Sequence, residues 1–164
     1  MTLSDDIKKS HSFNAETFEK KIKIGLLSSF TINGLGESLQ AKCASHKIGC
    51  TSYMCDYNQY NQDILNPQSD LYKFKPDITF LFLDTRSILG DLFYSPYKIG
   101  EKSRKNFIDD VINKIINLSQ TFTKNSNSKL VISNFTIPTY SPFGIYEHKT
   151  EYGLKEMILD LNQK

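Results

Sequence analysis

The fold prediction starts from one stretch of sequence, Pro76-Asp77-Ile78-Thr79-Phe80-Leu81-Phe82-Leu83. The Pro-Asp pair marks a turn, and the six residues after it are apolar on both faces of a strand except for Thr79. A strand without a polar face is typical of the centre of a parallel sheet, because helices cover both of its sides there. The stretch therefore predicts an α/β domain with a mostly parallel sheet.

The segments on either side predict that strands and helices alternate. We expect strands near residues 22–27, 50–55 and 130–132, and a first helix that is capped by Asn33 and closed by Ile48-Gly49. A long amphipathic helix is expected over 103–122, and a last helix from about Thr150. The order β-α-β-α-β-α-β-α implies right-handed crossovers and a doubly wound, three-layer parallel sheet.

The domain organisation follows from the same pattern. Residues 1–20 are polar with a few apolar anchors, which predicts a leader helix packed on the outside, and residues 21–164 form one α/β domain. The chain stops at Lys164, in or just after an amphipathic helix that usually leads to another strand in such a domain. We expect either a compact four-stranded variant or a piece that lacks the last strand.

Charge and composition exclude several classes of partner. Twenty basic and eighteen acidic residues leave a net charge of +2, which is too balanced for nucleic acid or an anionic membrane as the main partner. The small basic group of Lys102, Arg104 and Lys105 is interpreted as a solvated helix start rather than a phosphate site. No stretch approaches the roughly 20 apolar residues of a membrane span, and the polar N-terminus has no apolar signal core, so we expect a cytoplasmic protein.

The cysteines indicate neither a disulfide framework nor a metal site. There are three of them, Cys43, Cys50 and Cys55, and an odd number does not fit a set of paired bridges. Cys50 and Cys55 have a C-x4-C spacing without a second ligand pair, whereas zinc sites normally show tighter pairs. We expect them to be small apolar residues of a helix and a strand, and we expect no metal site.

The candidate site lies where parallel sheets bind their ligands, beyond the carboxyl ends of the strands. Ser28, Ser29 or Thr31 is a candidate nucleophile or phosphate ligand at the start of the following helix. The other polar residues predicted at these strand ends are Asp56, Asn58, Asp84, Arg86 and Asn134. In this set Asp84 would orient a partner, Arg86 would pair with an anion, and Asn134 would donate to an oxyanion. The competing interpretation is that these residues only cap strands and turns, as Ser, Asp and Asn commonly do.

A catalytic serine needs a general base, and only one of the three histidines is a candidate for it. Of His11, His46 and His148, only His148 follows the Pro-rich loop after the fourth strand and can approach the site. The sequence has no Asp-x-x-His pair. Nucleotide binding is also disfavoured, because Gly34-x-Gly36 lacks a third glycine and there is no Gly-x4-Gly-Lys-Ser/Thr.

Two runs of residues resemble a known family. Lys23-Ile24-Gly25-Leu26-Leu27-Ser28-Ser29-Phe30-Thr31 looks like the opening of the N-terminal domain of FkbH-like proteins. The more distinctive part is the run Asn58-Gln59-Tyr60-Asn61-Gln62-Asp63-Ile64-Leu65-Asn66-Pro67-Gln68-Ser69-Asp70-Leu71-Tyr72, which continues through Pro76-Asp77 to Asp84-Thr85-Arg86. The resemblance covers residues 22–164 and implies an SGNH-hydrolase-like domain of the flavodoxin-like, three-layer type.

The resemblance also implies a partner domain and an activity. FkbH-like proteins join this domain to a haloacid-dehalogenase-like domain, and characterised members load a glyceryl unit from a phosphorylated donor onto an acyl carrier protein. Their phosphoryl chemistry is assigned to an Asp-x-Asp-x-Thr motif with Mg²⁺ in the second domain. This chain contains no such motif, so we expect no cofactor of its own. It also carries Leu27-Ser28-Ser29-Phe30 where working SGNH hydrolases have Gly-Asp-Ser.

Three functional hypotheses follow. The first is an accessory module of an FkbH-like enzyme that holds substrate or carrier protein beside a partner active site. The second is an independent SGNH-like esterase or acyltransferase that uses Ser29 with His148. The third is a small-molecule binding domain whose pocket lies at the strand ends.

Overall fold

The computed structural model describes residues 7, 8, 10 and 14–164, and half of the predicted leader helix over 1–20 lies outside them. The described part of that segment includes a short 3-10 helix, η1 (Ala15–Thr17), which Asn14 caps through its side chain. The chain divides into two compact units. Unit 1 comprises Met1–Phe82 and Thr121–Ile132, and unit 2 comprises Leu83–Gln120 and Ser133–Lys164.

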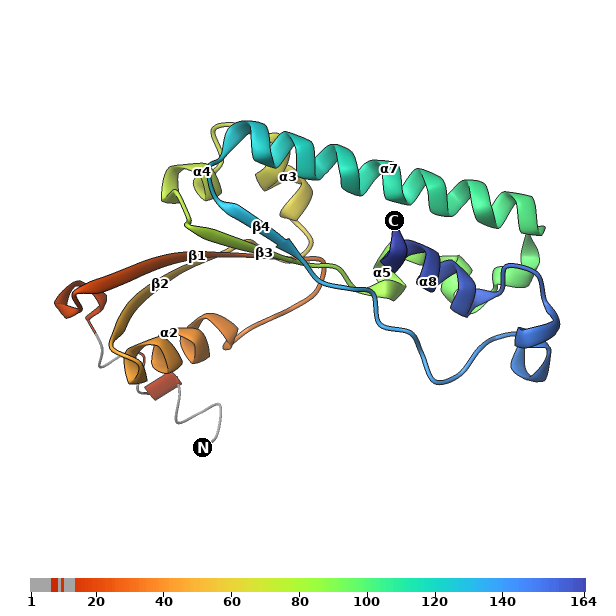
Figure 1. Ribbon diagram of the computed structural model, residues 1–164, viewed down its shortest axis with the longest axis horizontal. Helices are drawn as coiled ribbons and strands as arrows, with labels where there is room; N and C mark the ends of the chain where they lie inside the picture. The colour runs from red at the N-terminus through yellow and green to blue at the C-terminus, as the bar shows by residue number, and fades with distance from the viewer. Residues whose placement is uncertain (1–6, 9, 11–13) are drawn as a thin grey trace. The chain divides into compact units, whose positions relative to one another are not determined.

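Unit 1 is built on a four-stranded sheet in the order β2-β1-β3-β4 (Figure 1). The strands are β1 (Lys20–Ser28), β2 (Ile48–Met54), β3 (Ile78–Phe82) and β4 (Lys129–Ile132). All three pairings are parallel. The chain moves outward from β1 to β2 and then returns to the other side of β1, which is the arrangement of a doubly wound fold. The predicted α/β class and parallel sheet are therefore confirmed.

Helices cover both faces of this sheet. On one face, α2 (Leu35–Ser45) packs through Leu35 and Leu39 against a cluster that contains Ile24 and Leu26 of β1. On the other face, a Cβ added at Gly25 of β1 would meet Leu71, which belongs to α4. Helices α3 (Tyr60–Leu65) and α4 (Asp70–Phe74) and the end of α7 supply this second layer, and the ring of Tyr72 lies 6.1 Å from that of Phe122.

Both boundaries of the first helix in unit 1 were predicted wrongly, and at its start the N-cap residue is Gly34 rather than Asn33. Ile48-Gly49 does not close the first helix but begins β2, while the helix ends at Ser45 and the turn uses Lys47 with a φ of 60°. The glycine has another physical reason. A Cβ at Gly49 would lie 2.1 Å from the backbone oxygen of Ala15, so η1 approaches β2 too closely for a side chain.

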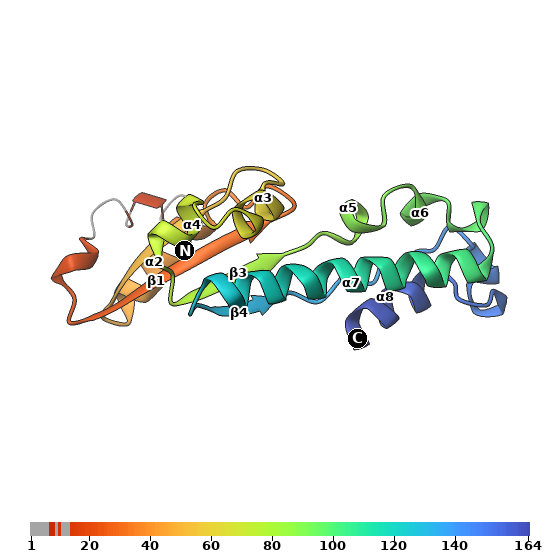
Figure 2. The ribbon, with the colours of Figure 1, turned by 90° about the horizontal axis from the view of Figure 1, so that it is seen from above.

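Unit 2 is helical apart from its loops. It contains α5 (Thr85–Leu89), α6 (Asp91–Tyr94), most of α7 (Glu101–Asn125) and α8 (Leu154–Gln163), which Figure 2 labels. It also contains the 3-10 helices η2 (Pro96–Lys98) and η3 (Gly144–Lys149). The long helix and the last helix were predicted, whereas α5, α6 and the 3-10 turns were not. Leu154, Met157 and Ile158 of α8 are fully buried, which confirms its predicted apolar face.

Arg104 corrects the prediction that the basic group on α7 is solvated. Its side chain is buried and donates to the backbone oxygens of Tyr152 at 2.8 Å, Glu151 at 2.7 Å and Ile99 at 2.6 Å. The guanidinium also lies over the ring of Phe143. Arg104 therefore ties the start of α7 to the loop before α8, while Lys102 and Lys105 are exposed.

Among the helices of the described residues, none combines the length and the apolar character that crossing a membrane requires.

Candidate functional site

The predicted serines lie at the carboxyl end of β1 in unit 1, and both are buried with 2 % exposure. The Oγ of Ser28 accepts the Phe30 N–H at 3.0 Å, so the hydroxyl stabilises the turn that leaves the strand. The Ser28 N–H donates to the Sγ of Cys55 at 3.3 Å. Burial raises the pKa of the Cys55 thiol above its ordinary value, which keeps it protonated and poorly nucleophilic.

The other predicted residues of unit 1 are exposed, in the segments that follow β1 and β2. Thr31 follows β1, and Asp56 and Asn58 follow β2. Asn58 has a φ of 56° and belongs to a turn, which agrees with the turn-forming role that asparagine often has. The backbone of Cys55 donates to Leu26 at 3.1 Å and so holds the two strand ends together.

In unit 2, Asp84 and Arg86 come together just beyond β3. Asp84 caps α5, because its Oδ2 accepts the Ser87 N–H at 3.1 Å. The same oxygen lies 3.6 Å from the Nε of Arg86, and the Arg86 side chain is 63 % exposed. The carboxylate therefore has a structural role as a cap and also orients the guanidinium beside it.

These two residues line a cavity of about 370 Å³ that lies entirely within unit 2. Thr85 closes one wall, since its Oγ1 donates to the backbone oxygen of Thr136 at 3.0 Å. The rings of Phe93 and Tyr140 meet edge to face, 6.2 Å apart. The complete lining is Asp84, Thr85, Arg86, Phe93, Thr136, Pro138 and Tyr140. The cavity thus combines one cation, Arg86, and one carboxylate, Asp84, with an aromatic wall.

Several lining residues were not predicted. The Pro-rich loop after the fourth strand was recognised, but Thr136, Pro138 and Tyr140 within it were not assigned to a site. Phe93 belongs to α6, a single turn of helix without any periodic pattern that the sequence could reveal.

Two predicted residues of unit 2 lie outside the cavity lining. Asn134 is exposed, and its neighbour Phe135 is buried and held by Asn162 through bonds of 2.7 and 2.9 Å to its backbone. His148 is exposed on η3. Because the serines belong to unit 1 and His148 to unit 2, a Ser-His pair stays a prediction.

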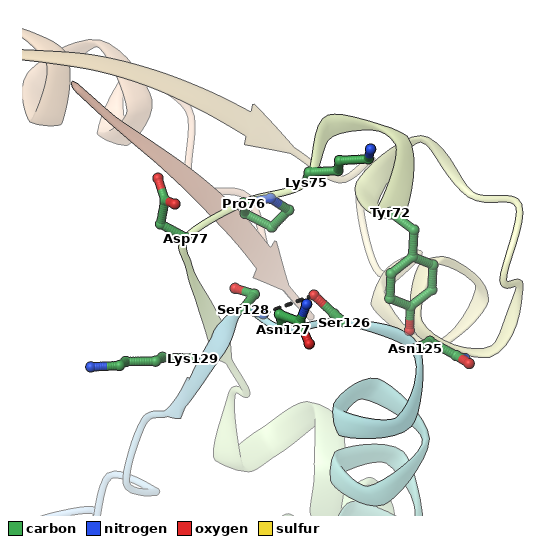
Figure 3. Close-up of a pocket in the computed structure, with 9 residues that line it drawn as sticks. All are labelled: Tyr72, Lys75, Pro76, Asp77, Asn125, Ser126, Asn127, Ser128 and Lys129. Atoms are coloured by element: carbon green, nitrogen blue, oxygen red, sulfur yellow. Dashed lines mark hydrogen bonds between the residues drawn. The ribbon is translucent and has the colours of Figure 1, made fainter.

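A second cavity, of about 650 Å³, lies in unit 1 at the opposite ends of the strands (Figure 3). It is bounded by the segments that enter β3 and β4, and its one carboxylate, Asp77, accepts the Lys23 N–H at 2.7 Å. The backbone of Asp77 also accepts the Lys129 N–H at 3.0 Å. These bonds join the strands, and ligands of parallel sheets bind at the other end, so this cavity is not the candidate site.

The acidic side chains and thiols do not gather into a metal centre in the part of the chain that the structure describes. No group of three or more His, Cys, Asp and Glu residues there could hold a metal ion.

Comparisons with known proteins agree with this architecture. No curated protein matches the chain. A solved structure with a similar fold is the N-terminal part of the protein BF1531 from Bacteroides fragilis, described as containing a phosphatase domain complexed with Mg. The match has a TM-score of 0.78 and 18% identity, and it covers 99% of this chain but only 41% of that one. The family model of the FkbH N-terminal domain matches residues 23–164, so this chain belongs to the FkbH N-terminal domain family.

Proposed function

We propose that this chain is a substrate-positioning module of an FkbH-like enzyme that loads a glyceryl or related unit onto an acyl carrier protein. Its partner would be a haloacid-dehalogenase-like phosphatase domain, on the same chain or on another. The observation that carries the proposal is the cavity of about 370 Å³ in unit 2, with Arg86 at its edge. Its size lies within the range of about 300–1,000 Å³ that is usual for small-molecule sites.

The lining suits a small phosphorylated acid. The Arg86 guanidinium is a bidentate partner for a phosphate or carboxylate, and its exposed side chain leaves it accessible to a ligand. Pro138 and the rings of Phe93 and Tyr140 offer an apolar wall for the carbon skeleton. Such a site binds and orients a substrate, but it offers no obvious nucleophile.

The burial of the serines supports positioning over hydrolysis. A nucleophile has to reach its substrate, whereas Ser28 and Ser29 are each 2 % exposed and Ser28 Oγ is engaged by the Phe30 N–H. The esterase alternative has its own test, because His148→Ala would abolish ester turnover if His148 is the base. Under our proposal, His148→Ala leaves the loading activity of the complete enzyme unchanged.

In this proposal, the phosphatase domain carries out the phosphoryl chemistry. The related solved structure contains a phosphatase domain with Mg, and we infer that Mg²⁺ acts on the partner of this chain as well. The loading reaction would take place in the cytoplasm, where carrier proteins and phosphorylated three-carbon acids meet.

The test is calorimetric titration of the chain with phosphoglycerate. We expect Arg86→Ala to weaken binding about 10- to 100-fold, the value of one or two charge-assisted hydrogen bonds. The control is Lys73→Ala on α4, which removes an exposed cation of unit 1 that pairs with Asp70. The proposal fails if phosphoglycerate does not bind, or if both variants weaken binding equally.

A further inference from the structure

Unit 2 exposes a group of aromatic and aliphatic side chains next to the cavity. We define the tyrosine patch as Tyr94, Tyr97, Tyr140, Ile145 and Tyr146, which are between 57% and 87% exposed. Soluble domains rarely leave several large apolar side chains exposed together unless they bind something. Tyrosine is also enriched in protein interfaces, because it offers a rigid apolar body with a polar tip.

Contacts between rings join the two segments that carry the patch. Phe93 packs against Tyr94 at 5.2 Å and Tyr140 at 6.2 Å, so it joins α6 to the Pro-rich loop. Tyr97 meets Phe143 at 6.2 Å, and Phe143 accepts the Tyr146 N–H at 3.1 Å. Two ring contacts, Phe93 with Tyr140 and Tyr97 with Phe143, therefore join segments 93–97 and 140–143, and Ile145 and Tyr146 follow in the next turn.

Arg104 fixes the two segments to each other from beneath. Its guanidinium lies over Phe143 and donates to the backbone of Ile99, just after Tyr97. Since Arg104 is buried and held by several carbonyls, the surface is preorganised rather than formed on binding. Preorganisation is what a docking surface for a folded partner needs.

We infer that the tyrosine patch is the docking surface for the phosphatase domain. This inference rests on the proposed function, and two observations select the occupant. The similar solved structure is described as containing a phosphatase domain, and this chain covers only 41% of it. In addition, Tyr140 belongs both to the patch and to the wall of the cavity, so a domain docked there would face the bound substrate.

The five side chains that define the patch are uncharged, although the exposed Lys98 directly follows Tyr97, and this composition favours a folded protein domain over a nucleic acid or an anionic membrane. The patch contains no Lys, Arg, Asp or Glu. Phosphate-rich partners are bound mainly through Lys and Arg. A domain interface instead has an aromatic core of this kind with a polar rim.

The experiment is photo-crosslinking of the full-length protein in its own cells. A benzophenone amino acid is placed at Tyr94 or Tyr146, with Tyr57 of unit 1, which is 68% exposed, as the matched control position. We expect phosphatase-domain peptides to be attached at Tyr94 and Tyr146 with about tenfold higher yield than at Tyr57. A Tyr97→Ser variant should lower the yield from Tyr94.

Other results overturn the inference. Crosslinks to a second copy of the chain, to residues 20–82 of the same chain or to a carrier protein would identify a different occupant, and absence of any crosslink would leave the surface without one. Phosphoglycerate titration of the same variants separates this failure from failure of the proposed function. If phosphoglycerate binding depends on Arg86 but no crosslinks form, only the docking inference fails. If crosslinks form but phosphoglycerate does not bind, only the proposed substrate site fails.

Discussion

Unit 1 and unit 2 are stabilised by different kinds of interaction. The sheet of unit 1 buries aliphatic side chains completely, among them Leu26, Leu27 and Leu81. Unit 2 buries two charged side chains, Arg104 and Glu147, together with the apolar face of α8. One chain therefore combines a hydrophobic scaffold with a region whose loops depend on specific polar contacts.

The polar contacts of unit 2 connect side chains to distant backbone. Glu147 accepts the Lys155 N–H at 2.7 Å at the start of α8, and the Ser141 hydroxyl also donates to its carboxylate. A Cβ at Gly153 would lie 2.8 Å from Glu147, so the glycine makes room for the carboxylate. Such contacts fix loops that have no repeating structure of their own.

The largest effect is expected from Leu81→Ala in β3. Leu81 is fully buried in the core of unit 1, and its loss should reduce the free energy of unfolding by about 3–5 kcal/mol. Urea unfolding measures the change, and hydrogen exchange should show faster exchange throughout Lys20–Ser28 and Ile78–Phe82. The control is Val131→Ala on β4, whose side chain is 44% exposed. Equal losses in the two variants would contradict a core centred on β3.

Arg104→Ala should have the next largest effect, and it should be confined to unit 2. The substitution leaves several carbonyl acceptors without the guanidinium, which we expect to cost about 2–4 kcal/mol. Hydrogen exchange of α8 should then accelerate about 30-fold or more, since each 1.4 kcal/mol is a factor of ten. Exchange in the strands should not change.

Lys105→Ala is the matched control for Arg104. Lys105 is exposed on the same turn of α7 and pairs with Glu101, so its removal should leave the urea midpoint and the exchange of α8 nearly unchanged. If the strands of unit 1 lost protection together with α8 in the Arg104 variant, the two units would unfold as one and the contrast between them would break down.

The same contrast explains what the sequence could predict. The strand at Ile78–Phe82 was recognised because a run without a polar face has few alternatives, and Asp84 and Arg86 were placed at its carboxyl end for that reason. The role of Arg104 was predicted wrongly. Its acceptors include backbone atoms 47 and 48 residues away, and a charge pattern gives no information about burial.

For a similar reason, only some of the residues that line the cavity could be predicted. Residues that follow a clear strand can be located from its end, whereas Phe93 and Tyr140 are brought together by short helices and a loop. Their positions depend on tertiary contacts that local propensity does not record. The polar strand ends were therefore identified, but the aromatic wall was not.

The smallest expected effect distinguishes the units by their response to acid. In unit 1, burial raises the pKa of Asp63, even though the Tyr53 hydroxyl donates to it at 2.8 Å. In unit 2, burial also acts to raise the pKa of Asp160, but hydrogen bonds from Tyr152 and Lys164 outweigh it and the pKa is lowered.

The signs of the two contributions are opposite. The contribution of Asp160 is fully present above the unfolded pKa of about 3.9 and is lost as the pH falls through its lower folded value. Ionised Asp63 is unfavourable in the folded state, so unit 1 gains stability as the pH falls through its raised pKa toward about 3.9. Asp63→Asn should abolish the gain in stability of unit 1 on acidification. Asp160→Asn should abolish the loss in stability of unit 2 on acidification. Carboxyl carbon NMR titration gives both values, and a midpoint for Asp63 below that for Asp160 would reverse the comparison.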